Sequence, residues 1–172
     1  MENDIWHKIK KHIHNGDRVA ELYHGEKDDI LMGLSYIVGT SGVVFGIDKL
    51  NPFSHYQNMS QLQNIPNIEL IKARIPPLPE KCSNLDAIII REFIWTFDFV
   101  GGEIRVNNNL YSELNSAIKN NGYLILVLNK PEKRQESEDT LCLRIIERYF
   151  QNFINISHEG YLIVSQKSRL KE

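Results

Sequence analysis

Short apolar segments alternate along this chain with segments in which apolar residues recur at helical spacing. The predicted parallel strands are RVAEL at 18–22, VVFGI at 43–47, IELIKARI at 68–75, LDAIIIREF at 85–93 and YLILVLNK at 123–130. The predicted helices lie at 30–37, 110–118 and 141–150. Alternating strands and helices bury their apolar sides best as a parallel sheet with helices on both faces, joined by right-handed crossovers. The sequence therefore predicts an α/β fold with three layers.

The two ends of the chain complete this arrangement. Two short strand patterns, at 153–157 and 161–166, predict a closing antiparallel hairpin. Within the first 16 residues, apolar side chains at helical spacing predict an amphipathic leading helix over residues 4–14. With 172 residues, 42% of them hydrophobic, the chain is long enough for one substantial core and too short for two ordinary domains. We therefore expect a single domain that spans residues 1–172.

Two polar segments interrupt the alternation. The segment 98–109, DFVGGEIRVNNN, contains glycine and asparagine and allows two interpretations, a substrate lid or a disordered connection. The segment 131–139 is almost entirely polar or charged, which predicts a solvated loop.

Composition and charge exclude several classes of protein. The formal net charge of −2 gives no general basic surface that would attract nucleic acid. The chain has no continuous apolar run of about eighteen residues, as a membrane-spanning helix needs, and its first residues lack the apolar core of a secretory signal. Cys82 and Cys142 are far apart and lack metal-ligand spacing, so we expect reduced thiols and no metal site. These features are typical of a cytoplasmic protein.

The ordered series of segments resembles the class I S-adenosylmethionine-dependent methyltransferases. VAEL, a loop containing Gly25, a helix and IVGTSGVVFGID are similar in order and length to the first two motifs of that family. NIELIKARIPPLP resembles the stretch that closes over adenine, LDAIIIREFIWTF the fourth strand and its turn, and NNGYLILV the fifth-strand motif. The resemblance covers the chain from Arg18 to Lys167. It implies a Rossmann-like fold whose seven-stranded, mostly parallel sheet ends in the antiparallel hairpin, with S-adenosylmethionine as cofactor.

The resemblance also implies where the cofactor would lie. Asp48, at the end of the second strand, matches the acid that accepts both ribose hydroxyl protons, although such a residue also caps a turn. Glu21 matches an acid near the amino acid end of the cofactor, or else pairs locally with Lys27 or Arg18, because a buried carboxylate needs a partner. Glu92, after the fourth strand, is a candidate general base. The residues expected at the cofactor are Glu21, Tyr23, Gly25, Asp48, Arg74, Ile75 and Arg91.

Three positions depart from the pattern of this family. Tyr23 and Lys27 replace glycines that let the backbone approach the cofactor. Arg74 replaces an acid that contacts adenine, and a guanidinium cannot accept a hydrogen bond. Lys27, Arg74 and Arg91 could together form a basic wall suited to a phosphate or carboxylate. The alternative is that they form ordinary surface ion pairs.

Three functions therefore stay open on the sequence. The first is a methyltransferase that binds S-adenosylmethionine in a modified way, with an unnamed acceptor. The second is a non-catalytic binding or scaffold subunit that has lost the cofactor and acts beside a protein partner. The third is a protein of the same fold that binds another nucleotide or phosphate ligand. Fold likeness alone does not choose among them, because function depends on the site.

Overall fold

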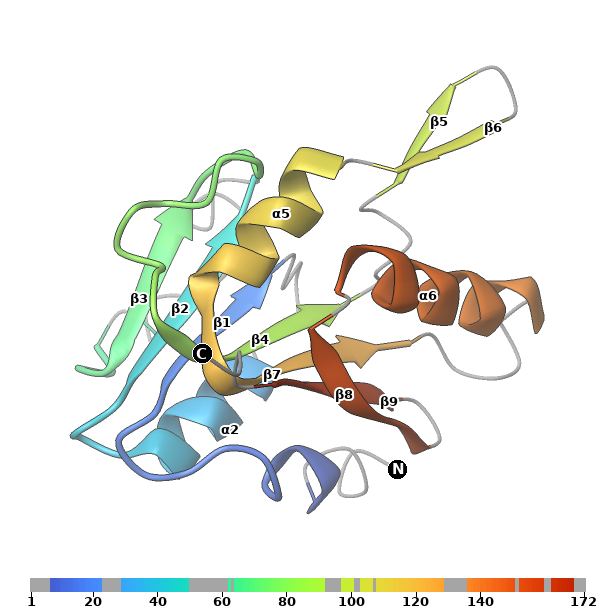
Figure 1. Ribbon diagram of the computed structural model, residues 1–172. Helices are drawn as coiled ribbons and strands as arrows, with labels where there is room; N and C mark the ends of the chain where they lie inside the picture. Colours follow the sequence, from blue (N-terminus) through green and yellow to red (C-terminus); the bar gives the residue numbers. More distant parts are fainter. Residues whose placement is uncertain are drawn as a thin grey trace.

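The computed structural model describes residues 7–22, 29–49, 62, 64–91, 97–100, 103–106, 108–128, 136–150, 152–159 and 162–168. Seven strands form one sheet in the order β3-β2-β1-β4-β7-β9-β8 (Figure 1). Their bounds are β1 Arg18–Leu22, β2 Val43–Asp48, β3 Ile68–Lys72, β4 Leu85–Arg91, β7 Ile118–Val127, β8 Phe153–Glu159 and β9 Leu162–Lys167. The first five strands in this order are parallel, and β9 pairs antiparallel with β7 and with β8. The predicted seven-stranded, mostly parallel sheet with a closing antiparallel hairpin is confirmed.

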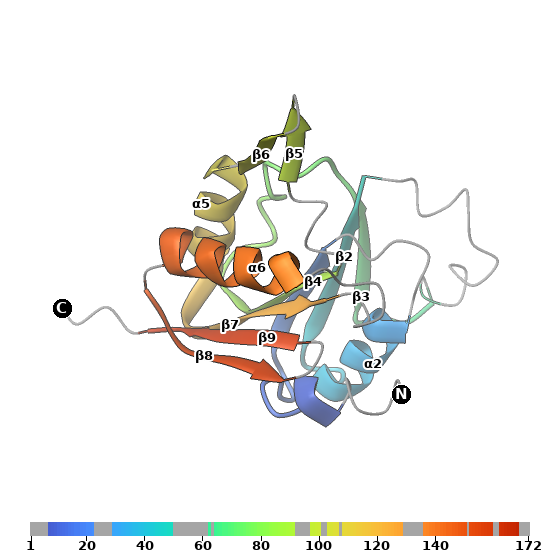
Figure 2. The ribbon, with the colours of Figure 1, turned by 90° about the vertical axis from the view of Figure 1, so that its right-hand side faces the viewer.

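Helices cover both faces of this sheet (Figure 2). Helix α2, Asp29–Val38, lies on one side, and helices α5, Asn108–Ala117, and α6, Glu136–Tyr149, lie on the other. Side chains alternate between the faces along each strand, so the core divides in two. We call the side that carries Val19, Val44 and Ile89 the α2 face, and the side that carries Ala20, Phe45 and Ile88 the α5 face. The central strands are buried on both faces, which explains their nearly unbroken apolar sequences.

Several predicted boundaries were wrong. The described part of the leading segment is helical only at residues 7–9 and continues as turns, although Ile9 and Ile13 are buried in the core of the α2 face as their spacing suggested. Strand β3 ends at Lys72 rather than at residue 75. Strand β7 begins at Ile118, inside the predicted helix, and helix α6 begins at Glu136, inside the predicted loop.

The segment predicted as a lid or a disordered connection contains a small sheet. Strands β5, Phe97–Val100, and β6, Glu103–Val106, pair antiparallel with each other and form a sheet of their own. Both views show this hairpin standing out from the body of the domain, toward the side where the carboxyl ends of β2 and β3 lie (Figures 1 and 2). The described part of the segment is therefore regular backbone, and a lid function stays a prediction.

Candidate functional site at the carboxyl edge of the sheet

The order of strands reverses between β1 and β4. From β1 the chain builds β2 and β3 on one side, and then crosses to β4 and β7 on the other side. In open α/β sheets, ligands bind outside the carboxyl ends of the strands at such a reversal. The residues that end β1, β2 and β4 therefore mark the candidate site.

The register brings three predicted site residues into one row. Glu21 in β1 is paired with Gly46 in β2 and with Ile89 in β4. Asp48 and Arg91 each lie two residues beyond these partners, and side chains two apart on a strand point to the same face. Glu21, Asp48 and Arg91 thus share the α2 face at the carboxyl edge of three adjacent strands. All three are buried.

Glu21 forms an ion pair with Arg91 across the reversal point. The guanidinium Nε donates to Glu21 Oε1. The Glu21 side chain is completely buried and that of Arg91 is 10% exposed, so both charges have left bulk water and depend on their contacts. The pair is neutral as a unit, so Arg91 adds no uncompensated positive charge to the predicted basic wall. Its partners are seventy positions apart in the chain, and only the strand order shows that they meet.

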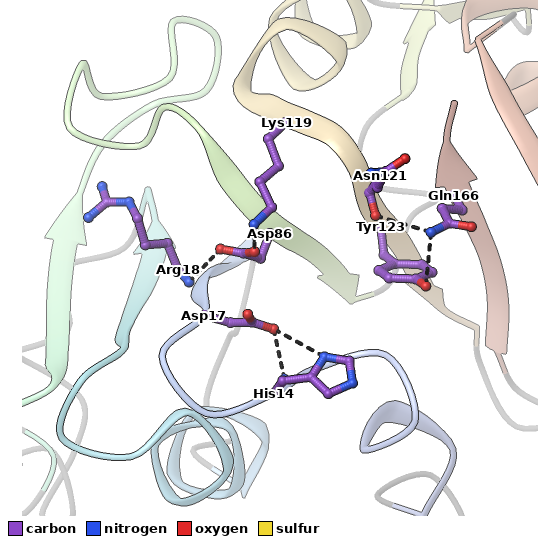
Figure 3. Close-up of polar contacts among 8 residues, drawn as sticks. All are labelled: His14, Asp17, Arg18, Asp86, Lys119, Asn121, Tyr123 and Gln166. Atoms are coloured by element: carbon purple, nitrogen blue, oxygen red, sulfur yellow. Dashed lines mark hydrogen bonds and ion pairs between the residues drawn. The ribbon is translucent and has the colours of Figure 1, made fainter. Parts of the chain in front are cut away.

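The local pairing of Glu21 with Arg18 was a wrong prediction. Arg18 begins β1 at the opposite edge of the sheet, where its backbone N–H donates to Asp86 Oδ2 at 2.9 Å. Figure 3 shows its side chain leading away from that contact, toward β2 and β3. The guanidinium lies over the Phe45 ring, 5.3 Å from its centroid. Pairing with Lys27 concerns a residue outside the described part of the chain.

Asp48 ends β2 and is only 5% exposed. Its backbone carbonyl accepts a hydrogen bond from Ala73 N–H at 3.0 Å, which extends the contact between β2 and the segment after β3. This hydrogen bond holds the end of β2 against the start of the connection from β3 to β4. The proposed interaction of its carboxylate with ribose stays a prediction.

Arg74 and Ile75 follow β3 and differ in their surroundings. Arg74 is exposed. Ile75 is half-buried and packs against the core of the α5 face, as do Ala73 and Leu78. The apolar residue is thus held by the core, whereas the exposed arginine extends into solvent, where it contributes to a ligand site only as a solvated charge.

The loop residues of the predicted site lie outside the described part of the chain. This concerns Tyr23, Gly25 and Lys27 in the loop after β1, and Glu92 after β4. Their assigned roles stay predictions. Among the described residues, no three His, Cys, Asp or Glu side chains lie close enough together to hold a metal ion. No helix in the described part of the chain is long and apolar enough to cross a membrane.

The opposite, amino edge of the sheet carries a second polar network (Figure 3). Asp86 accepts from Arg18 N–H and forms an ion pair with Lys119. Nearby, Asp17 Oδ2 accepts from His14 N–H at 2.7 Å. Burial, with Asp86 as an additional negative neighbour, raises the pKa of Asp17 above its ordinary value. The contacts of Asp86 hold the beginnings of β1, β4 and β7 together. This network is separate from the row of Glu21, Asp48 and Arg91, which lies at the carboxyl edge.

Comparison with solved structures relates this arrangement to known proteins. A SAM-dependent methyltransferase from Aquifex aeolicus is 20% identical, with a TM-score of 0.69, covering 96% of this chain and 90% of that one. A SAM-dependent O-methyltransferase from Thermotoga maritima is 17% identical, with a TM-score of 0.68, covering 99% of this chain and 66% of that one. A precorrin-6y C5,15-methyltransferase from Geobacter metallireducens is 13% identical, with a TM-score of 0.66, covering 93% and 85%.

Comparison of the sequence with protein-family models and with curated proteins gives no match. At these identities, the structural similarity concerns the fold. The predicted resemblance is confirmed at that level: the chain has the Rossmann-like fold that is shared by class I S-adenosylmethionine-dependent methyltransferases.

Proposed function

We propose that this protein is an S-adenosylmethionine-dependent methyltransferase whose cofactor lies along the carboxyl edge of β1, β2 and β4. The observation that carries the proposal is the position of Asp48, a buried carboxylate that ends β2 beside the reversal point of a methyltransferase-like sheet. A carboxylate there suits a ligand with two adjacent hydroxyl groups, because it can accept both protons.

In this proposal Asp48 binds the ribose, and the Glu21–Arg91 pair forms the neutral floor under the amino acid end of the cofactor. The bound cofactor would supply a methyl group on a positively charged sulfur. The chain itself would contribute mainly alignment of the acceptor with that methyl group, with Glu92 as the candidate base. The acceptor is left unassigned.

Calorimetric titration of the purified protein with S-adenosylmethionine and S-adenosylhomocysteine tests this function. Micromolar binding of either compound, about −8 kcal/mol, is expected. Asp48→Ala should abolish the heat of binding while the thermal melt of the protein stays cooperative. Glu69→Ala is the matched control, because Glu69 is an exposed acid on β3 away from the carboxyl edge; it should bind as the wild type does. Equal losses in both variants would remove the ribose role of Asp48.

One observation favours a second function, that of a non-catalytic subunit. The Glu21 carboxylate is completely buried and already paired with a cation of its own chain, so it is less available to an ammonium group of a ligand. In that case neither compound would produce heat or raise the melting temperature, and Tyr23→Gly, which removes the ring predicted to occupy the loop, would restore no binding. Restored binding in Tyr23→Gly would instead identify Tyr23 as the obstacle.

A further inference from the structure

The crossover from β3 to β4 lacks a helix. All of its residues, 73–84, are described, and they form bends and a turn around the sequence IPPLPEK, with no helix or strand. Right-handed crossovers place this connection on the α5 face, where Ile75 and Leu78 pack against the core. An irregular segment covers less of a sheet than a helix does, so part of the α5 face near the amino ends of β1, β2 and β3 remains accessible.

A cleft of about 390 Å³ lies at this place. Arg18, Val43 and Ile68, which line it, are the first residues of β1, β2 and β3. Val43 and Pro66 supply apolar surface, Phe45 lies buried beneath the Arg18 guanidinium, and Lys81 contributes from the crossover segment. The volume falls in the range of small-molecule sites, roughly 300–1,000 Å³.

The charges around the cleft favour an anion. The Arg18 guanidinium lies over the Phe45 ring and donates to the Lys81 carbonyl at 2.9 Å, so it is held in place. The Lys81 ammonium contacts Glu69 Oε1 at 2.8 Å, and both of these side chains are about half exposed. An ion pair exposed to this degree contributes little and exchanges readily. Two cations face one carboxylate, which leaves one positive charge beside an apolar floor.

We propose that this cleft binds a small ligand with a flat apolar body and a carboxylate, such as an aromatic monocarboxylate. The carboxylate would lie between the Arg18 guanidinium, whose planar fork suits it, and the Lys81 ammonium, which exchanges Glu69 for the ligand. The apolar body would lie against Val43 and Pro66. The site is separate from the proposed cofactor site, because strands of five or six residues, at about 3.3 Å per residue, lie between the two edges. It is therefore too remote to present a methyl acceptor.

Titration of the full chain with indole-3-acetate, followed by amide NMR shifts, tests the proposal. Saturable shifts are expected at Arg18, Phe45, Ile68 and Lys81, and the neutral probe indole-3-acetamide should bind at least threefold more weakly. Stronger binding of indole-3-acetamide or shifts confined to the carboxyl edge would overturn the site. Tighter binding of phenyl phosphate than of indole-3-acetate would overturn the choice of a carboxylate.

Two charge variants have opposite expected effects. Lys81→Gln should weaken indole-3-acetate binding at least threefold, because it removes a cation, and Glu69→Gln should strengthen it at least twofold, because it removes the competing carboxylate. Lys72→Gln is the control: Lys72 is an exposed cation on the same strand as Glu69 but on the opposite face, and it should leave the affinity unchanged. Equal effects of Lys81→Gln and Lys72→Gln would show a non-specific charge effect and refute the site. The outcome does not depend on S-adenosylmethionine binding.

Discussion

Replacement of Arg91 by methionine should destabilise the protein strongly. The substitution keeps most of the apolar length of the side chain and removes its charge. It leaves the Glu21 carboxylate, which is completely buried, without the guanidinium that neutralises it. Breaking a buried ion pair by removing one partner typically costs about 3–5 kcal/mol. That is a large share of the roughly 5–15 kcal/mol by which domains of this kind are stable.

The two single variants should be unequal. Glu21→Gln leaves Arg91, whose side chain is 10% exposed at the end of β4, and a long arginine can turn its head toward water. We therefore expect Glu21→Gln to cost about 1–2 kcal/mol, less than Arg91→Met. The double variant Glu21→Gln with Arg91→Met should lie closer to the wild type than Arg91→Met does, because neither member of the former pair then carries a charge.

Urea unfolding followed by circular dichroism measures these free energies. The deficit of Arg91→Met should be smaller at pH 5 than at pH 8, because protonation of the remaining carboxylate removes the buried charge. Arg74→Met is the control, since Arg74 is exposed after β3, and its effect should stay within about 0.5 kcal/mol. An Arg91→Met variant within about 1 kcal/mol of the wild type, or one less destabilised than Glu21→Gln, would refute the reasoning.

Three further predictions concern the rest of the sheet. Burial raises the pKa of Asp17, so the charged form of this side chain lowers the stability of the folded protein above that pKa. Asp17→Asn should therefore raise the melting temperature at pH 7, and this gain should disappear as the pH falls toward 3. A gain that is independent of pH would contradict this. Burial raises the pKa of the Cys82 thiol to about 11, and the residue is 2% exposed. Ellman's reagent at pH 8 should therefore label this thiol slowly in the folded protein and rapidly in urea. Rapid labelling without urea would contradict its burial. A Cβ at Gly122 would lie 2.8 Å from the Asp86 carbonyl oxygen and 2.7 Å from Ile118 Cγ2. Gly122→Ala should therefore cost about 1–3 kcal/mol in urea unfolding, and a neutral result would show that the bulge between β4 and β7 can yield.

The sequence predicts best where burial alone decides the structure. Strand β1 has the predicted limits, and β2 extends only one residue further, to Asp48, because each is a short apolar run bounded by polar turns. Strand β7 shows the opposite case. Its first residues include Lys119, Asn120 and Asn121, which are exposed, and Asn121 has a positive φ of 67°. The register with β4 passes from Ile118 directly to Tyr123, so this polar stretch forms a bulge between two paired parts of the strand, and Gln166 Nε2 donates to the Asn121 carbonyl at 3.2 Å. A bulge of this kind has no signature in the local pattern.

The β5–β6 hairpin was missed for a related reason. Each of its strands has only four residues, and a hairpin of this size depends on backbone pairing with its partner more than on a hydrophobic pattern. Helix α6 begins five residues earlier than its apolar positions indicate, because a polar first turn does not prevent helix formation.

The candidate site was predictable one residue at a time but not as a row. A buried acid in VAEL, an aspartate after VVFGI and an arginine after LDAIII each indicate the end of a strand. Their relation depends on two facts of the sheet. β1 lies between β2 and β4, and the registers offset Asp48 and Arg91 by two residues from the partners of Glu21. A shift of one residue in either pairing would move one of these side chains to the other face.

The row of Glu21, Asp48 and Arg91 underlies both proposed functions, the methyltransferase and the non-catalytic subunit. The two functions differ in whether the Arg91 guanidinium moves when a ligand binds. A ligand ammonium that binds Glu21 replaces one cation by another at the same carboxylate, so the electrostatic change at Glu21 is small. The cost lies in moving the guanidinium, which is 10% exposed at the end of its strand and so needs only a short displacement to reach water. If the guanidinium moves, it becomes a partner for the carboxylate of the same amino acid ligand. If its contacts hold it in place, the floor of the site stays closed to an ammonium, and the domain keeps the fold without the cofactor. Arg91 therefore matters more than Glu21 for whether this edge of the sheet can bind an amino acid group.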